Sequence, residues 1–203
     1  MATGAQRPAR VRNQRGEGDR LRAALLEAAG DLLAEAQDID ELSVRAVTAR
    51  AGVSPTALYL HFADKEELVV AVKTSCFEAL GEVLRRAEAA YEGDPEAQLR
   101  AMGRAYLRFA REQPGRYAIL FHTQHTPAQP RRKRRKPVVG LDVFELVVAA
   151  VARCRGDDAD AFEIAVALWM ALHGRALAVG ALPGFPFPDE ERFVDLLVER
   201  LVG

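Results

Sequence analysis

Apolar residues recur at spacings of three and four along most of the chain, and the strict alternation typical of β-strands is almost absent. This period is that of an α-helix with one buried face. The pattern predicts an all-α protein of about nine helices. The longer helices are expected at about residues 19–36, 65–90, 95–112, 138–154, 158–180 and 189–202, with a short one at 116–121.

Two further short helices are predicted from turn and cap residues. Ser43 is a good N-cap for one of them, and Gly52 ends it because glycine tolerates a left-handed backbone. Ser54 followed by Pro55 marks the start of the next, where the missing N–H of proline costs no hydrogen bond. Two helices joined by a three-residue turn predict a helix-turn-helix.

The following helix is expected to connect two parts of the chain. Asp64, with Glu67 three residues later, resembles a capping box at its start. The apolar stripe of this helix is formed by Leu68, Val72, Cys76, Leu80 and Val83. We therefore divide the chain into a basic arm at 1–18, a helix-turn-helix domain at 19–65 and a helical body at 66–203.

The outer face of the third helix is the predicted DNA-reading surface. The residues expected to pack the second and third helices on the first are Val44, Val47, Val53, Leu58 and Phe62. This packing leaves Thr56 and Tyr59 outside, facing a major groove. Lys65 lies beside a helix N-terminus, which favours a phosphate. The expected DNA-binding residues are Ser43, Arg45, Ser54, Pro55, Thr56, Ala57, Tyr59, His61 and Lys65. For Tyr59 and His61 the alternative is ordinary surface polarity.

The segment SVRAVTARAGVSPTALYLHFADKEEL, residues 43–68, resembles the DNA-binding module of the TetR family of transcriptional regulators. The family pattern is present as Ala-Gly-Val-Ser at 51–54, Leu-Tyr-x-His-Phe at 58–62 and Lys-x-x-Leu at 65–68. Thr56 is a departure, since many members carry glycine there. Its methyl and hydroxyl groups mean that base contacts cannot be carried over from relatives.

The C-terminal half has a weaker resemblance. LWMALHGRALAV, residues 168–179, is similar to a Trp-x-x-x-His-Gly signature in the C-terminal domain of one TetR subgroup. The family implies that this domain binds a small effector and dimerises through the last two helices. The candidate ligand-binding residues are Tyr106, Phe109, Phe121, Phe144, Trp169 and His173. The alternative is a packed core with a hydrogen-bonded histidine.

The net charge of −1 conceals an uneven distribution. Four arginines lie in residues 1–15, and RRKRRK occupies 131–136. Without these ten, 18 basic residues remain against 29 acidic ones, a charge of −11. The arm either adds a salt-dependent contact to DNA or is a disordered tail. The basic run is either a solvated loop or an auxiliary contact to DNA or a partner.

Several classes of function are not expected. The two cysteines and His122 and His125 show no metal-ligand spacing, and no catalytic or phosphate-binding motif is present. We therefore expect no enzyme, cofactor or metal. The apolar run 164–183 could span a bilayer by length, but Arg175 lies near its middle. No secretory leader is visible, so a cytoplasmic protein outside the membrane is expected.

These features together predict a ligand-responsive regulator, most simply a repressor. It would bind a palindromic duplex as a homodimer and leave DNA when a small, largely apolar effector binds. The alternative is a dimeric DNA-binding regulator without a small-molecule ligand. The sequence names neither the operator, the effector nor the regulated genes.

Overall fold

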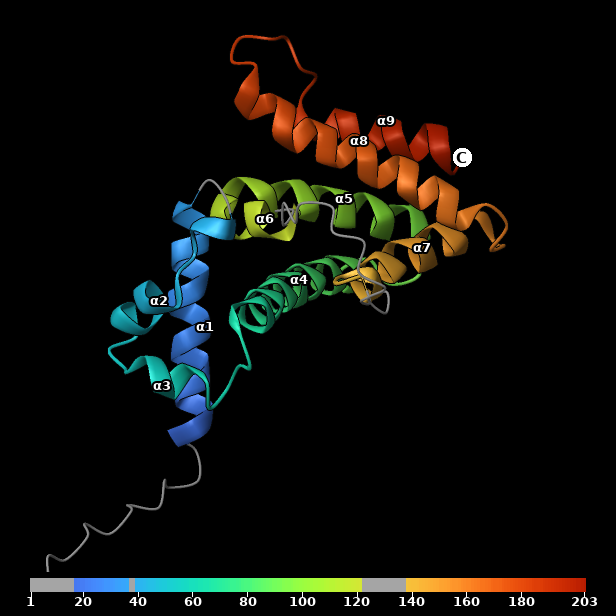
Figure 1. Cartoon of the computed structure of the whole chain (residues 1–203). Helices are drawn as coiled ribbons and strands as arrows, with labels where there is room; N and C mark the ends of the chain where they lie inside the picture. The colour runs from blue at the N-terminus through green and yellow to red at the C-terminus, as the bar shows by residue number, and fades with distance from the viewer. Residues whose placement is uncertain (1–16, 37–38, 122–137) are drawn as a thin grey trace, which may run out of the picture.

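The computed structural model describes residues 17–36, 39–121 and 138–203, which fold into nine α-helices and one 3₁₀ turn without any β-strand (Figure 1). The all-α prediction is confirmed for these residues. The elements are α1 (Glu17–Glu35), η1 (Ile39–Glu41), α2 (Val44–Arg50), α3 (Pro55–Leu58), α4 (Lys65–Ala89), α5 (Pro95–Glu112), α6 (Pro114–Phe121), α7 (Leu141–Arg155), α8 (Ala161–Ala181) and α9 (Glu190–Leu201). The predictions for the N-terminal arm, for His122 and His125 and for the basic run 131–136 lie outside the described residues.

The start and end signals of α2 and α3 act largely as predicted. The N–H of Ala46 donates to Ser43 Oγ at 3.1 Å, which caps α2. Gly52 has φ +69°, a left-handed conformation that ends the helix. Ser54 occupies the N-cap position of α3 and Pro55 the first helical position, but the Ser54 side chain makes no capping hydrogen bond. Pro55 alone therefore carries the start signal of α3.

The start of α4 is a capping box displaced by one residue. The N–H of Glu67 donates to Asp64 Oδ1 at 2.8 Å, as predicted. The Glu67 carboxylate returns to the N–H of Ala63 at 2.6 Å, one residue before the cap, instead of to that of Asp64. Two N–H groups at the helix start are satisfied in either arrangement.

The first three helices pack around a small apolar core. Val47, Leu58 and Phe62 are buried against α1, whereas Val44 and Val53 are only half-buried at its edge. On α1 itself the buried stripe consists of Leu25, Ala28, Ala29 and Leu33. Leu21 and Leu32 lie at the margins of this stripe and are half-buried.

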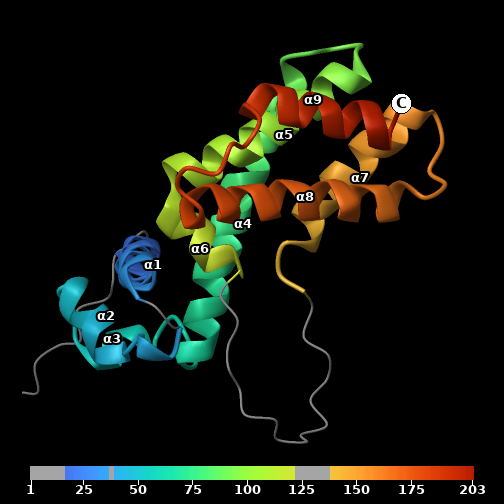
Figure 2. The same cartoon turned by 90° about the horizontal axis from the view of Figure 1, so that it is seen from above.

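Helix α4 runs from this module into the body of the molecule (Figures 1 and 2). Its buried stripe matches the prediction at four positions: Leu68, Val72, Cys76 and Leu80. The fifth predicted residue, Val83, is only half-buried, and its neighbour Leu84 is buried instead. α1 also packs against α4 and α6, so the module and the body share contacts. The boundary that we placed at residue 65 coincides with the first residue of α4 and stays a prediction.

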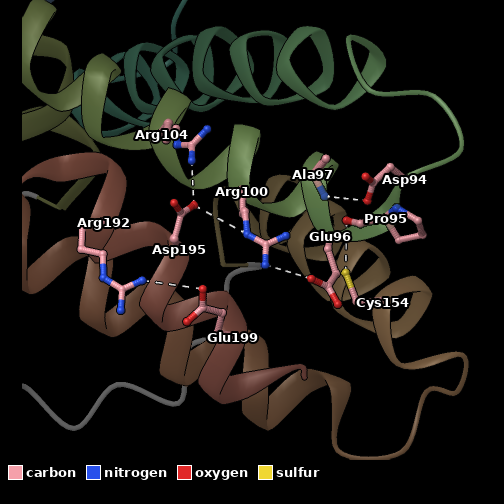
Figure 3. Close-up of polar contacts among 10 residues, drawn as sticks. All are labelled: Asp94, Pro95, Glu96, Ala97, Arg100, Arg104, Cys154, Arg192, Asp195 and Glu199. Carbon is pink, nitrogen blue, oxygen red and sulfur yellow. Dashed lines mark hydrogen bonds and ion pairs between the residues drawn. The ribbon is translucent and has the colours of Figure 1, made fainter.

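Helix α5 is the centre of the body and contacts α4, α6, α7, α8 and α9. Asp195 of α9 lies between two arginines of α5, 2.7 Å from Arg104 Nη2 and 3.6 Å from Arg100 Nε (Figure 3). Beside them, a Cβ placed on Gly103 would approach Val194 Cγ1 to 3.0 Å. The close contact and the ion pairs hold α9 firmly against α5.

Helix α8 is the one described helix that is long and apolar enough to cross a bilayer, a property that core helices of soluble proteins share. One side of it is buried against the body through Ala165, Leu168 and Leu172. The other side is open, with Met170 54% and Leu177 56% exposed. α8 therefore presents an apolar face that no described part of this chain covers.

Candidate DNA-binding face and ligand cavity

The outer surface of α2 and α3 carries the predicted DNA-binding residues. Ser43, Arg45, Ser54, Pro55, Thr56 and Tyr59 are exposed, and Ala57, His61 and Lys65 are half-buried. Tyr59 follows α3 directly and is 55% exposed. The structure thus brings all nine residues to one module and leaves the side chain of Tyr59 open to a partner. Their contact with DNA stays a prediction.

Two of these nine side chains also hold the module together. Ser43 caps α2, and Lys65 Nζ donates to the carbonyl oxygen of Asp40 at 3.2 Å. The second bond ties η1 to the start of α4. An ammonium has three N–H donors, so this bond leaves Lys65 able to donate to a phosphate as well.

Sequence reasoning did not identify two contacts that fix α2. The Thr48 hydroxyl is buried and lies 3.0 Å from the carbonyl oxygen of Val44 and 3.2 Å from that of Arg45. Arg50 forms a two-bond pair with Glu35 at the end of α1, at 3.0 and 3.2 Å. These hydrogen bonds to Arg50 lower the pKa of the Glu35 carboxyl. In the sequence, the only indication of these contacts was that Thr48 lies four residues after Val44, the spacing at which a threonine hydroxyl can donate to a helical carbonyl oxygen.

The body contains a cavity of about 530 Å³ bounded by α4, α5, α6, α7 and α8 and by residues 138–140. This volume is in the range of small-molecule sites, about 300–1,000 Å³. Four of the six candidate ligand-binding residues line it: Tyr106, Phe121, Phe144 and Trp169. The Trp169 ring lies 6.1 Å from the Phe121 ring and 6.0 Å from that of Phe144 between centroids. Three helices thus contribute to one aromatic wall.

The other two candidates lie away from the cavity surface. Phe109 is fully buried in the core, one turn beyond Tyr106 on α5. His173 lies behind the aromatic wall, with its ring 4.2 Å from that of Phe121 and 5.8 Å from that of Trp169. Direct ligand contact by His173 would need a rearrangement of this wall.

His173, which is half-buried, belongs with the buried Tyr106 and Tyr117 to a polar cluster that joins three helices. The hydroxyl of Tyr117 on α6 lies 2.7 Å from His173 Nδ1 and 3.0 Å from the hydroxyl of Tyr106 on α5. Burial lowers the pKa of His173 and raises the pKa of both tyrosines, so all three are neutral near pH 7. The Tyr106 hydroxyl also lies 3.4 Å from His173 Nδ1, so the three groups contact one another. The cluster connects α8 to α5 and α6.

Sequence reasoning also missed part of the cavity lining. Lys73 and Phe77 of α4 and Phe162 of α8 line the cavity. Burial lowers the pKa of Lys73. Lys73 lies four residues after the buried Val69 and four before Phe77, so it falls in phase with the apolar face of α4. A lysine in such a register was the signal in the sequence.

Gly140 shapes the cavity through its missing side chain. Its φ is +88°, and a Cβ there would come within 2.4 Å of the Phe77 ring. Both the backbone conformation and the close approach require glycine. The Phe77 ring consequently packs on the backbone just before α7.

Comparison with known proteins agrees with this geometry. The family model for bacterial regulatory proteins of the tetR family matches residues 25–72, and the model for the tetracyclin repressor-like C-terminal domain matches residues 99–201. A solved protein of unknown function from Rhodococcus sp. RHA1 is 28% identical with a TM-score of 0.72, covering 94% of this chain and 100% of that one. A TetR family member from Streptomyces coelicolor A3 is 26% identical with a TM-score of 0.66, covering 90% and 98%.

A curated relative is similar over a shorter stretch. An uncharacterized HTH-type transcriptional regulator from Haemophilus influenzae is 33% identical over 69 residues, which is 34% of this chain and 34% of that protein. The match therefore spans about a third of the relative's length. The resemblance of residues 168–179 to the Trp-x-x-x-His-Gly subgroup stays a prediction.

Proposed function

The chain belongs to the TetR family of transcriptional regulators and is a DNA-binding protein, and we propose that it is a homodimeric repressor released from its operator by a small effector. The observation that carries this proposal is the cavity of about 530 Å³ beside α4, the helix that begins in the DNA-binding module. The family and the fold are those of transcriptional regulators, not of enzymes. An operator-binding role implies a cytoplasmic location.

The DNA contacts follow from the exposed face of α3. Thr56 and Tyr59 enter the major groove, and Lys65 contacts the phosphate backbone beside it. One recognition helix per chain reads one half-site. A twofold dimer therefore reads a palindrome whose half-sites lie about 34–36 Å apart or a multiple of that distance.

Dimerisation is supported by the open apolar face of α8. Met170 and Leu177 are each more than half exposed, and Leu196 extends the surface onto α9. Burying such a face against a second copy removes apolar area from water. The family resemblance implies that the same two helices, α8 and α9, form the dimer interface. The opposite side of the molecule carries α2 and α3, so both copies keep their DNA-binding modules free (Figure 1).

The effector site is supported by the composition of the cavity wall. The wall is apolar and aromatic, and its few polar groups come from Lys73, Tyr106 and Trp169. Pockets for small molecules have this composition. A ligand that shifts α4 alters the placement of α3. By thermodynamic linkage, the effector then lowers the affinity for DNA, and DNA lowers the affinity for the effector, by the same factor, commonly about 5- to 150-fold.

The experiment uses the single tryptophan of the chain. Because Trp169 lines the cavity, its fluorescence reports occupancy. An operator is first selected from a random duplex pool with the purified protein. A small apolar compound that changes Trp169 emission should lower operator affinity, measured by fluorescence anisotropy. If compounds that occupy the cavity leave operator affinity unchanged, the protein is instead a dimeric regulator without a ligand.

A further inference from the structure

The aromatic wall extends through a fourth ring to the opening of the cavity. Phe162 lines the cavity, and its ring lies edge to face with that of Phe144, 5.6 Å away between centroids. Phe162 is 53% exposed, and two further lining residues, Leu141 and Val138, are 46% and 74% exposed. In the part of the chain that the structure describes, the cavity therefore opens between the start of α8 and residues 138–141. Aromatic rings lead inward from this opening.

The rings of the wall meet at angles and not face to face. The planes of Phe144 and Trp169 are inclined by 71°, and those of Trp169 and Phe121 by 33°. Aromatic rings prefer edge-to-face or offset contacts with centroids about 4.5–7 Å apart. A further ring in the cavity can therefore continue the arrangement that the wall already has. His173 supports the wall from behind, with its ring 5.8 Å from that of Trp169.

The polar groups of the cavity lining already have partners within the protein. The Tyr106 hydroxyl lies 3.0 Å from that of Tyr117 and accepts a hydrogen bond from the Trp169 side chain. Lys73 also has an interaction with another group of the protein. Among the described residues, the buried side-chain atoms without a hydrogen-bond partner belong to two arginines, and neither arginine lines the cavity. The lining therefore holds no buried polar group that needs a ligand to satisfy it.

This lining disfavours a charged ligand. Of the described residues that form the wall, none is a carboxylate, so a cation would find no opposite charge there. The faces of the rings can attract a cation, which is the competing possibility. An anion would have to compete with the existing interaction of Lys73. Burying an ion without a full set of partners is costly, and an uncharged ligand avoids that cost.

Helices α4 and α5 complete the cavity mainly with aliphatic side chains. These include Leu80 and Leu84 of α4 and Leu99 and Met102 of α5. A methionine adapts its shape to a neighbour, and its sulfur makes favourable contacts with aromatic rings. The volume of about 530 Å³ lies in the range of sites that enclose drug-sized ligands, so several rings can be accommodated. An alkyl chain would also suit this aliphatic side, so a preference for rings must come from the aromatic wall.

We propose that the effector is an uncharged compound of two or more linked or fused aromatic rings, which pack along the aromatic wall from Phe162 inward. A polar substituent on such a compound lies at the opening, where water satisfies it. This inference rests on the proposed function, in which the cavity holds the effector. The competing occupant is a saturated compound of the same size, held by the aliphatic side chains alone.

The test compares four probes built on one two-ring skeleton: biphenyl-4-ol, its saturated analogue 4-cyclohexylcyclohexan-1-ol, biphenyl-4-carboxylate and the cation of 4-(aminomethyl)biphenyl. Biphenyl-4-ol is uncharged at neutral pH, because a phenol has a pKa of about 10. Titration calorimetry on the full-length protein measures the affinity for each probe, and fluorescence anisotropy measures the affinity for the operator.

We expect biphenyl-4-ol to bind at least about fivefold more tightly than the saturated alcohol, because only the aromatic rings gain the edge and face contacts. The saturated alcohol has at least as much apolar surface, so hydrophobic burial alone would not produce this order. Biphenyl-4-ol should also bind at least about tenfold more tightly than either ion. Its binding should lower operator affinity.

Variants assign the ring preference to the aromatic wall. Phe162→Leu replaces a ring that is more than half exposed, so the fold should be kept, and the advantage of biphenyl-4-ol over the saturated alcohol should fall at least about twofold. Phe144→Leu, further inside, should reduce the advantage as well. Phe185→Leu is the matched control, since Phe185 is 58% exposed and lies outside the cavity. It should leave the affinities for both alcohols unchanged.

The outcomes separate this inference from the proposed function. Equal or tighter binding of the saturated alcohol, or an unchanged ring preference in Phe162→Leu, overturns the aromatic effector. Equal or tighter binding of either ion overturns the uncharged one, and failure of biphenyl-4-ol to bind overturns both. If one of the other probes binds and releases DNA, the proposed function stands without this inference. If biphenyl-4-ol binds along the wall and operator affinity does not change, the ligand class is right and effector-driven release is wrong.

Discussion

Lys65 connects two roles at the scale of a single residue. Its ammonium holds the carbonyl oxygen of Asp40, which fixes η1 against the start of α4. The same side chain is our candidate for a phosphate contact. Such a contact is sequence-independent, because it is made to the backbone of the duplex and not to a base edge.

We predict that Lys65→Ala lowers affinity by a similar factor for all DNA sequences and flattens the salt dependence by about one ion per subunit. The measurement is operator affinity at several salt concentrations. Lys65→Arg keeps the charge and serves as the control. Unchanged affinity and salt slope in the alanine variant would restrict Lys65 to its structural bond with Asp40.

The Tyr117 hydroxyl is the central member of the polar cluster that it forms with Tyr106 and His173. We predict that Tyr117→Phe costs about 1–3 kcal/mol of unfolding free energy, because His173 Nδ1 and the Tyr106 hydroxyl each lose their shorter hydrogen bond and keep only the 3.4 Å contact with each other. Urea titration of the purified protein measures the loss. Tyr91→Phe, at a tyrosine that is 47% exposed, should change stability by less than about 0.5 kcal/mol. An equally small effect at Tyr117 would contradict the hydrogen-bond assignment.

At the scale of an element, α6 touches both the DNA-binding module and the cavity. Its second residue, Gly115, faces α1 so closely that a Cβ would come within 2.5 Å of Ala34 Cβ. Its last residue, Phe121, lines the cavity. One eight-residue helix therefore reaches from the aromatic wall of the cavity to α1. In the proposed function, α6 is a second connection, besides α4, between the cavity and the DNA-binding module.

We predict that Gly115→Ala separates α6 from α1 and costs about 1–3 kcal/mol of unfolding free energy through overpacking. Gly30→Ala is the matched control on α1, since its Cβ would lie 3.8 Å from Val72 in ordinary contact. That change should be neutral or stabilising by up to about 1 kcal/mol, because alanine favours the helix. Thermal and urea unfolding measure both. Equal stabilities of the two variants would exclude the tight α1–α6 contact.

The helix bounds were largely predictable from the sequence, because local signals set them. Pro95 after Asp94 places the start of α5, and Gln113 before Pro114 places its end at Glu112. The predicted start of α6 was less accurate, since we expected the helix to begin at residue 116 and it begins at Pro114. Pro114 instead occupies the first helical position, where its ring is tolerated.

At the scale of the whole molecule, α8 and α9 form one outer side and α2 and α3 lie at the opposite end (Figure 2). The candidate site was only partly predictable because five helices and residues 138–140 build the cavity. The period of a helix indicates that a residue faces inward but not what it meets there. Phe109 and Tyr106 are both buried on α5, yet only Tyr106 reaches the cavity.

We predict that Met170→Glu in the open face of α8 produces a monomer with full helix content and greatly weakened operator binding. A carboxylate buried between two apolar surfaces has no partner to offset its desolvation. Sedimentation velocity measures the mass and circular dichroism the helix content. Tyr91→Glu, at the turn after α4, is the control and should remain dimeric. A Met170→Glu dimer as stable as the wild type would place the interface elsewhere.

The length of α4 has a mechanical consequence for reading DNA. Its 25 residues make a rod of about 37 Å. If that rod tilted by about 5° around its far end, its first residue would move by about 3 Å, close to the 3.4 Å rise between neighbouring bases on one strand. Such a tilt would therefore displace the recognition helix by about one base-pair step. In the proposed dimer, a tilt of α4 by this amount would put the two recognition helices out of register with their half-sites.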